Sequence, residues 1–258
     1  MTDSLRALVS NIIDYAGLYP PAGLPLAEVL ERYRRYRASA QSWMLNRLVL
    51  PAAKLAEARL EVGWRVTLLA DGELGPLPDQ VETLESKGCP HVDLPVYCET
   101  PLEQIPKRPH TFAKIRTGGL TPEVIPSCPD LAQFLHAAAT RRIPFKATAG
   151  LHHPIRAEYP LTYAPDAPRA VMHGFLNVFA AAALAWHGAP VFLLTAILEE
   201  TDASAFRFLE GELVCGHGRG PGLGTGQIKA ARLEFAHSFG SCSFEEPVAG
   251  LRELGLLP

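Results

Sequence analysis

The sequence predicts an α/β protein of the (β/α)8 TIM-barrel type that is irregular in its C-terminal third. The chain has 258 residues, of which 48% are hydrophobic, so residues 1–258 can bury one large core and favour a single barrel domain over two small ones. Short apolar runs alternate with segments of helical periodicity, which indicates parallel strands joined by helices. Because such crossovers are right-handed, a closed barrel is the simplest arrangement.

The first two thirds of the chain carry the regular pattern. Six runs resemble strands that end near glycine, proline or polar residues, and they cover residues 11–18, 45–50, 64–70, 91–99, 110–119 and 143–150. Helical spacing predicts helices over residues 26–37, 53–60, 80–87 and 130–142, and Gly88 supplies a stop for the third of these.

The regular alternation ends after Pro154. We expect a proline-rich loop or lid at 157–169, a deeply packed helix at 172–187, a strand or helix at 191–199 and a hairpin at 206–215. The glycine-rich segment 216–226 lacks the G-x-x-x-x-G-K-[ST] pattern, which favours a flexible loop over a nucleotide loop. Ser243 and Glu246 fit a capping box for a last helix that runs through residue 254.

Composition restricts the class of partner. The net charge is -3 and no long basic run is present, which argues against a nucleic acid or a membrane surface and favours a small anionic metabolite. The longest apolar stretch, 174–186, is too short to span a bilayer. Five cysteines without a C-x-x-C pair predict reduced thiols in a cytoplasmic protein, and the N-terminus does not resemble a signal peptide. An oligomer is compatible with this composition.

Two strands share an arrangement of cations. Residues two apart in a strand point to the same side, so Lys114 is expected beside Arg116, and Lys146 beside Thr148. Glycine ends each strand at the face where barrel active sites are built. Crowded cations would lower the pKa of Lys146 and leave it a neutral nucleophile. The alternatives are a lysine on the barrel rim and an anion-binding cluster that forms no covalent bond.

Three segments together carry a family resemblance. HVDLPVY at 91–97, AKIRTGGLTPEVI at 113–125 and PFKATAGL at 144–151 resemble successive strands of the class I aldolases of the deoxyribose-phosphate aldolase type. The resemblance implies a Schiff base on Lys146 and a catalytic role for Asp93. The chain departs from the family after Lys146, where it has no second K-x-S-x-G-G strand and continues with His-His-Pro.

Histidines suggest a different chemistry. His152 and His153 follow the Lys146 strand, and His173 lies four residues before Asn177 on one helix face. With Asp14 or Glu99 they could form a divalent metal site, although adjacent histidines on an extended segment point in opposite directions. The alternative is that they act as acids, bases or substrate hydrogen-bond donors.

The sequence as a whole predicts an aldolase-like or lyase-like barrel enzyme that acts on a small anionic carbonyl or sugar-derived compound through an active-site lysine. No cofactor is required, and a divalent metal remains an option. The small residues 238–243 add backbone amides and Ser241 as binding groups. The alternatives are a metal-dependent hydrolase or lyase centred on the histidines and a non-enzymatic barrel that binds an anionic metabolite. The predicted catalytic residues are Lys146, Lys114, Asp93, His152 and His153, and the predicted substrate-binding residues are Arg116, Thr148, His173, Asn177 and Ser241.

Overall fold

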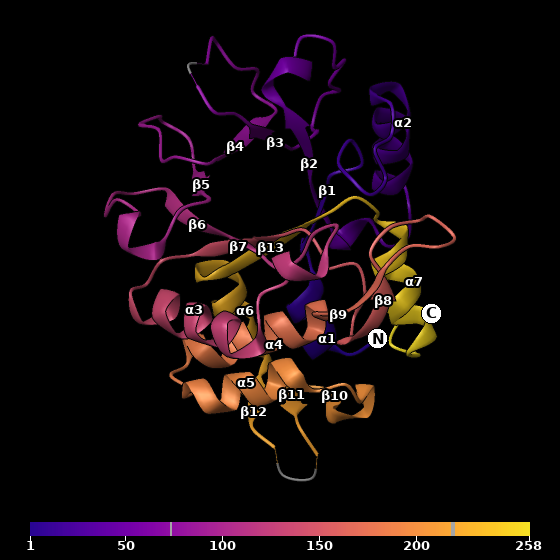
Figure 1. Ribbon diagram of the computed structural model, residues 1–258, viewed down its shortest axis with the longest axis vertical. Helices are drawn as coiled ribbons and strands as arrows, with labels where there is room; N and C mark the ends of the chain where they lie inside the picture. Colours follow the sequence, from indigo (N-terminus) through magenta and orange to yellow (C-terminus); the bar gives the residue numbers. More distant parts are fainter. Residues whose placement is uncertain (73, 218–219) are drawn as a thin grey trace.

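Eight parallel strands close into a barrel in the computed structural model, which describes residues 1–72, 74–217 and 220–258. Each strand pairs with the next in the sequence, and the last strand pairs with the first, as the order around the barrel shows (Figure 1). The predicted TIM-barrel class is therefore confirmed. The barrel strands are β1 (Ile13–Tyr15), β2 (Leu45–Pro51), β3 (Val66–Leu69), β4 (Val81–Ser86), β5 (Val96–Cys98), β6 (Thr111–Arg116), β7 (Phe145–Thr148) and β13 (Ala236–Ser241).

Two of these strands differ from the sequence-based expectation. Residues 81–86 form β4, where a helix was expected over 80–87. No strand was predicted at 236–241, which form β13 and include part of the hydroxyl-rich segment 238–243. The pairing of β4 is stabilised by a buried hydrogen bond between the Thr67 and Thr83 hydroxyls, whose oxygens are 2.8 Å apart. The helix expected at 53–60 is also wrong, because that connection holds only one 3-10 turn.

Helices α3 to α6 lie on one side of the barrel. In Figure 1, α3, α4, α5 and α6 lie around β6, β7 and β13, whereas the connections from β2 to β6 are loops and short turns. Apolar side chains from these loops, including Leu55, Leu60, Leu74, Leu77 and Leu94, pack against the core in place of helices. The helices are α1 (Asp3–Val9), α2 (Leu26–Arg37), α3 (Cys128–Thr140), α4 (Phe175–Trp186), α5 (Val191–Glu199), α6 (Thr225–Glu234) and α7 (Glu245–Glu253), and the 3-10 turns are η1 (Ser42–Met44), η2 (Ala52–Lys54), η3 (Leu102–Gln104), η4 (Pro122–Val124) and η5 (Ala203–Ala205).

The C-terminal third is irregular, as predicted. In place of a loop at 157–169, β8 (Ala157–Pro160) and β9 (Arg169–Met172) form an antiparallel hairpin. The predicted hairpin at 206–215 is present, and a third strand extends it, giving a sheet of β10 (Phe206–Phe208), β11 (Glu212–Cys215) and β12 (Gly222–Gly224). Residues 218 and 219 of the glycine-rich segment lie outside the described residues.

The expectation for the thiols holds only in part. A disulfide joins Cys89, in the connection between β4 and β5, to Cys98, the last residue of β5. Cys128, Cys215 and Cys242 are free and buried. The prediction that all five are reduced is therefore wrong for the first pair. In the part of the chain that the structure describes, no helix is long and apolar enough to cross a membrane.

Candidate active site

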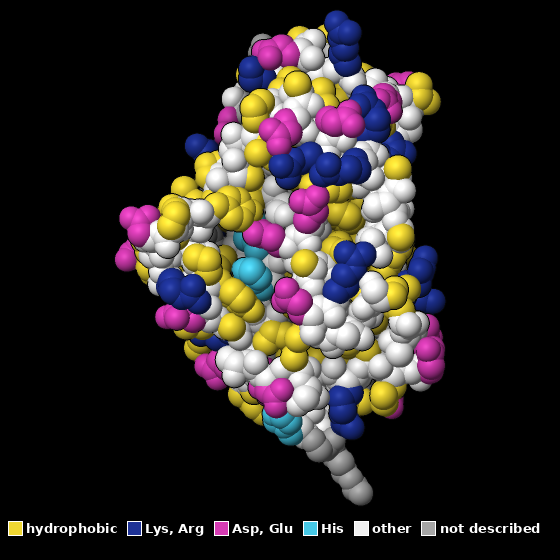
Figure 2. Space-filling model, turned by 90° about the vertical axis from the view of Figure 1, so that its right-hand side faces the viewer, with side chains coloured by type: hydrophobic (Ala, Val, Ile, Leu, Met, Phe, Trp, Pro, Cys, Tyr) yellow, Lys and Arg dark blue, Asp and Glu magenta, His cyan; other side chains and the backbone are white. Residues whose placement is uncertain are grey.

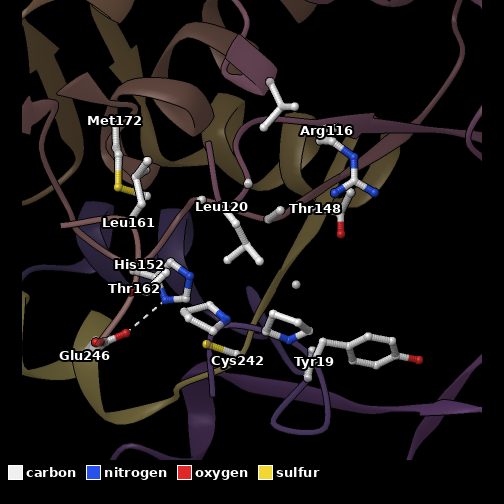
Figure 3. A pocket seen from close by; sticks show the side chains of 18 of the residues that line it. Tyr19, Arg116, Leu120, Thr148, His152, Leu161, Thr162, Met172, Cys242 and Glu246 are labelled. Atoms are coloured by element: carbon white, nitrogen blue, oxygen red, sulfur yellow. Dashed lines mark hydrogen bonds and ion pairs between the residues drawn. The ribbon is translucent and has the colours of Figure 1, made fainter. Parts of the chain in front are cut away.

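A cavity of about 570 Å³ opens at the carboxyl ends of the barrel strands. Its walls come from the segments that follow β1, β6, β7 and β13, and the β8–β9 hairpin contributes Leu161, Tyr163 and Met172. Figure 3 shows Arg116 and Thr148 on one side of the cavity and His152 with Glu246 on the other. On the face drawn in Figure 2, histidine is visible in a hollow between hydrophobic and acidic side chains. Active sites of TIM barrels occupy this end.

The predicted pairing of the two lysine strands is present. Lys114 lies opposite Lys146 in the register of β6 and β7, and Arg116 lies opposite Thr148. The cations are held together by carboxylates. Glu85 on β4 contacts both lysines, because its Oε2 is 2.9 Å from Lys114 Nζ while its Oε1 is bonded to Lys146 Nζ.

Lys146 is an ammonium ion at the centre of the barrel. Its side chain is 1% exposed, and its Nζ is 2.5 Å from Asp14 Oδ2 in addition to its bond with Glu85. Burial alone would lower the pKa of Lys146, but the two carboxylates outweigh this effect and raise the pKa. The expected lowering of this pKa by neighbouring cations is therefore wrong, because the nearest charges are negative.

The same network holds both carboxylates ionised. Although burial acts to raise their pKa values, Lys146 lowers the pKa of both Asp14 and Glu85. Asp14 also accepts hydrogen bonds from the Ser238 hydroxyl at 2.8 Å and the Asn46 amide at 2.7 Å. These polar partners explain how strand β1 can carry a fully buried aspartate.

Lys114 is the lysine that reaches the cavity. It lines the cavity together with Arg116, Thr148 and Glu85, whereas Lys146 lies beneath the lining residues. Lys114 Nζ is also 2.9 Å from Glu99 Oε2, and Arg116 donates to the other oxygen of Glu99 at 3.0 Å. A chain of alternating charges thus connects the buried Lys146 to the half-exposed Arg116.

His152 and Glu246 form a pair on the opposite wall. His152 Nδ1 is 2.9 Å from Glu246 Oε2 and 3.3 Å from the Ser241 hydroxyl oxygen. Burial acts to raise the pKa of Glu246, and the bond with His152 lowers it below its usual value. Since Nδ1 faces the carboxylate, the Nε2 atom is the nitrogen left for a substrate.

His153 also lines the cavity, and its imidazole stacks on Tyr159 with ring centroids 3.6 Å apart. Burial and the neighbouring His152 lower its pKa from 6.5 to about 4. As pH falls, His153 is therefore protonated in the unfolded chain before it is protonated in the folded chain. Its contribution lowers the free energy of unfolding as pH falls from 6.5 to about 4.

We expect His153→Phe, which keeps an aromatic ring against Tyr159, to lose less stability than the wild type over that pH interval. Denaturant unfolding at pH 7 and at the acid end of the interval measures the difference. An equal loss in both proteins would show that His153 titrates normally in the folded state.

Gly118 and Gly150, which follow the two lysine strands, are in close backbone contact. A Cβ atom added to Gly150 would lie 2.8 Å from Gly118 Cα, and the φ angle of Gly150 is +81°. We predict that Gly150→Ala lowers the free energy of unfolding by about 1–3 kcal/mol, because the new side chain is strained and meets backbone atoms. Thermal and denaturant unfolding test this.

A matched control is available at Gly88, where an added Cβ meets nothing within 4 Å and φ is not positive. Gly88→Ala should change the free energy of unfolding by no more than about 0.5 kcal/mol. Equal effects of the two substitutions would contradict a special role for the Gly118–Gly150 contact.

Three predicted site residues lie elsewhere. Asp93 is exposed and precedes β5, so it lies at the amino ends of the strands, away from the cavity. His173 is buried and its Nε2 is 2.8 Å from the Pro126 carbonyl oxygen. The Asn177 side chain is occupied by the backbone of Arg156, Ile197 and Glu200. These positions are corrections to the predicted site: Asp93 comes before a strand that begins at Val96, and Asn177 is on α4, where its side chain holds backbone atoms. His173 is not on the expected helix, because α4 begins only at Phe175, and its imidazole is bonded to the Pro126 carbonyl. The structure brings Lys114, Arg116, Thr148, His152 and His153 to the cavity, with Ser241 behind His152 and Lys146 below Lys114.

Sequence reasoning missed Glu85, Glu246, Tyr163 and Cys242 as residues of the cavity. The Tyr163 hydroxyl lies 3.5 Å from Cys242 Sγ, which joins the hairpin to the end of β13. A strand assignment for 80–87 would have placed Glu85 on the same face as Thr83, and the capping-box reading assigned Glu246 to its own helix. The Ser243 hydroxyl does accept from the Glu246 amide at 3.1 Å, but the Glu246 carboxylate goes to His152.

Among residues 1–72, 74–217 and 220–258, no three His, Cys, Asp or Glu side chains are grouped so that they could hold a metal ion. Searches with known family models, against curated proteins and against solved structures returned no match for this chain. The class of the molecule is thus defined by its own geometry. It is an α/β barrel with a cavity at the carboxyl ends of its strands.

Proposed function

We propose that this barrel is an enzyme of the lyase or aldolase type that moves a proton on the carbon next to the carbonyl group of a small anionic substrate. The observation that carries the proposal is that one cavity is lined by Lys114 and Arg116 and by the His152–Glu246 pair. Figure 3 shows Arg116 on one side of the cavity and the pair on the other. Such chemistry needs a cationic group where negative charge develops and a base within reach of the proton.

Arg116 and Lys114 supply the cationic wall. The Arg116 Nε and one terminal nitrogen contact Glu99, which leaves its other terminal nitrogen for a substrate carboxylate or phosphate. Lys114 Nζ contacts Glu85 and Glu99. An ammonium group has three N–H donors, so one can reach a substrate carbonyl oxygen and stabilise the enolate formed when the proton leaves.

His152 is the proposed base. Glu246 accepts from Nδ1–H, fixes the imidazole and favours its charged form after proton transfer. Nε2 then takes the proton from the carbon next to the carbonyl group, and the C–H electron pair forms the enolate. The protonated imidazole can return a proton to the same carbon, which restores the carbonyl compound. Ser241 limits rotation of the ring through its contact with the same Nδ1.

Lys146 has a positioning role in this proposal. A Schiff base requires a neutral amine, whereas the carboxylates of Asp14 and Glu85 stabilise the ammonium form of this buried side chain. Lys146 instead fixes Glu85, which in turn holds Lys114 at the cavity. The aldolase resemblance thus supports the location of the chemistry, while the ion pairs favour a non-covalent role for its central lysine.

Exchange of carbon-bound hydrogen tests the proposal without knowledge of the full reaction. The protein is incubated in D2O with pyruvate, 2-oxobutyrate and dihydroxyacetone phosphate separately, and proton NMR follows the loss of the signal next to the carbonyl. We expect catalysed exchange of at least one compound, and His91→Asn, at an exposed histidine, should leave it unchanged. Folded protein that exchanges none of them would contradict the proposal.

Treatment of the same mixtures with sodium cyanoborohydride separates the covalent and non-covalent versions. We expect no reduced adduct on Lys114 or Lys146 by peptide mass spectrometry under conditions that give exchange. An adduct on Lys146 that accompanies exchange would restore the Schiff-base mechanism and would overturn the positioning role given to this residue.

A further inference from the structure

A second cavity, of about 600 Å³, lies at the opposite end of the barrel from the candidate active site. It is bounded by α1, by α6 and by the amino ends of the barrel strands, with Tyr97, Phe112 and His237 among its lining residues. Its side chains are strongly basic, although the chain as a whole has a net charge of -3. The cationic lining residues are Arg6, Arg47, Arg65, Lys229 and Arg232.

Carboxylates balance only part of this charge. Glu82 pairs with both Arg47 and Arg65, at 2.8 and 2.9 Å. Asp3, the acidic residue in the lining, accepts from the Gly211 amide at 2.7 Å. In the part of the chain that the structure describes, no ion pair is recorded for the three other lining cations, Arg6, Lys229 and Arg232.

Arg232 shows the imbalance most clearly. Its terminal nitrogens donate to backbone carbonyls, among them those of His237 at 2.6 Å and Ser10 at 3.0 Å, and its buried Nε has no hydrogen-bond partner. Burial lowers the pKa of this guanidinium to about 9. Backbone carbonyls and the Phe179 ring, 5.0 Å from the guanidinium carbon, are the near partners of this charge. An anion in the adjoining cavity would stabilise it further.

The two cavities are separated by packed side chains. The rings of Tyr97, Phe112 and His237 pack on one another, with the Phe112 centroid 5.3 Å from that of Tyr97 and 5.1 Å from that of His237. The Tyr97 hydroxyl is also 2.8 Å from His237 Nδ1. Lys146 Nζ lies 5.5 Å from the centre of the Tyr97 ring. Among the described residues, none lines both cavities, so a ligand in the second cavity would contact a different set of side chains from a ligand in the first.

We propose that this cavity binds a compound with two linked anionic groups, of the diphosphate type. The cations come from separate elements, with Arg47 and Arg65 on β2 and beside β3, Lys229 and Arg232 on α6, and Arg6 on α1. Because cations face the cavity from α1, from α6 and from the β2 and β3 side, the separate charges of a diphosphate can pair with more of them than one small anion can. The proposal is independent of the reaction at the other end of the barrel.

Calorimetric titration of the full chain with inorganic pyrophosphate tests the site. Arg6→Gln and Lys229→Gln change exposed side chains and should each raise the Kd about tenfold, equivalent to about 1.4 kcal/mol, with a larger loss in the double variant. Lys87→Gln, an equal charge change at an exposed residue after β4, and Arg116→Gln in the other cavity should leave the Kd within about twofold of the wild type.

Titration with ADP distinguishes the source of the diphosphate. Tighter binding of ADP than of pyrophosphate would indicate a nucleoside diphosphate, and equal binding would indicate recognition of the diphosphate group alone, so both outcomes support the site. Absence of pyrophosphate binding, an unchanged Kd in the Arg6 and Lys229 variants, or loss of binding in Arg116→Gln would overturn it.

Discussion

Replacement of Lys146 by methionine is expected to lower the free energy of unfolding by about 3–5 kcal/mol, the cost of removing one partner from a buried ion pair. Methionine fills a similar volume, so the loss comes mainly from charge. The carboxylates of Asp14 and Glu85 would remain buried without the ammonium that both contact. Urea unfolding at pH 7, followed by circular dichroism, measures the change.

The pH dependence provides an internal check. In the wild type, Lys146 lowers the pKa of Asp14 and Glu85, so these carboxylates add stability above their unfolded pKa values, and this stability is lost as pH falls. Without Lys146 the two carboxylates should be protonated at higher pH. The difference in the free energy of unfolding between the wild type and the variant should therefore decrease in acid. Asp14→Asn combined with Lys146→Met should be more stable than Lys146→Met alone. A loss below about 1 kcal/mol in the single variant would contradict the ion-paired centre.

Replacement of His152 by asparagine is expected to slow catalysed deuterium exchange by about 10²–10⁴-fold, the usual contribution of a positioned general base. The protein should remain folded, because asparagine is smaller than histidine and keeps a polar side chain at the cavity wall beside Glu246 and Ser241. The exchange rate at saturating keto acid, measured by NMR, reports the chemical step.

Glu246→Gln tests the partner in the same assay. It keeps the shape of the side chain and removes its charge, so the exchange rate should fall by less than in His152→Asn, and its pH dependence should shift. Wild-type exchange in His152→Asn would show that another group removes the proton.

The lysine strands were predictable because their signals are local. Lys114 comes two residues before Arg116, and Lys146 comes two residues before Thr148. A glycine follows shortly after each pair. Side-chain alternation and parallel pairing then bring them together, as the register of β6 and β7 confirms. The same rules identified six of the eight barrel strands.

The carboxylates that neutralise these lysines were not predictable in the same way. In Val-Glu-Thr-Leu-Glu-Ser at 81–86 the apolar residues Val81 and Leu84 are three positions apart, which is helical spacing. The strand, and with it the position of Glu85, depends on pairing with β3 and β5. Asp14 was noted only as a metal ligand, and its bond to Lys146 joins residues 132 positions apart. The predicted direction of the pKa shift of Lys146 was therefore wrong, because the pKa is raised and not lowered.

Strand β13 was missed because of its composition. Ala-His-Ser-Phe-Gly-Ser contains no β-branched residue, and the strand pairs with β1 and β7, which are both distant from it in sequence. Glu246 was assigned to a helix start from local spacing, whereas its carboxylate contacts His152 across 94 residues of sequence. Contacts between distant segments thus decide the chemistry of this cavity.

A crystal structure of the protein with oxalate, a planar analogue of the pyruvate enolate, tests the candidate site most directly. One oxalate carboxylate is predicted to contact Lys114 and Arg116, with the other directed toward His152, while Lys146 keeps its bonds to Asp14 and Glu85. Oxalate bound against Lys146 and away from Lys114, or its absence from this cavity at saturating concentration, would contradict the account.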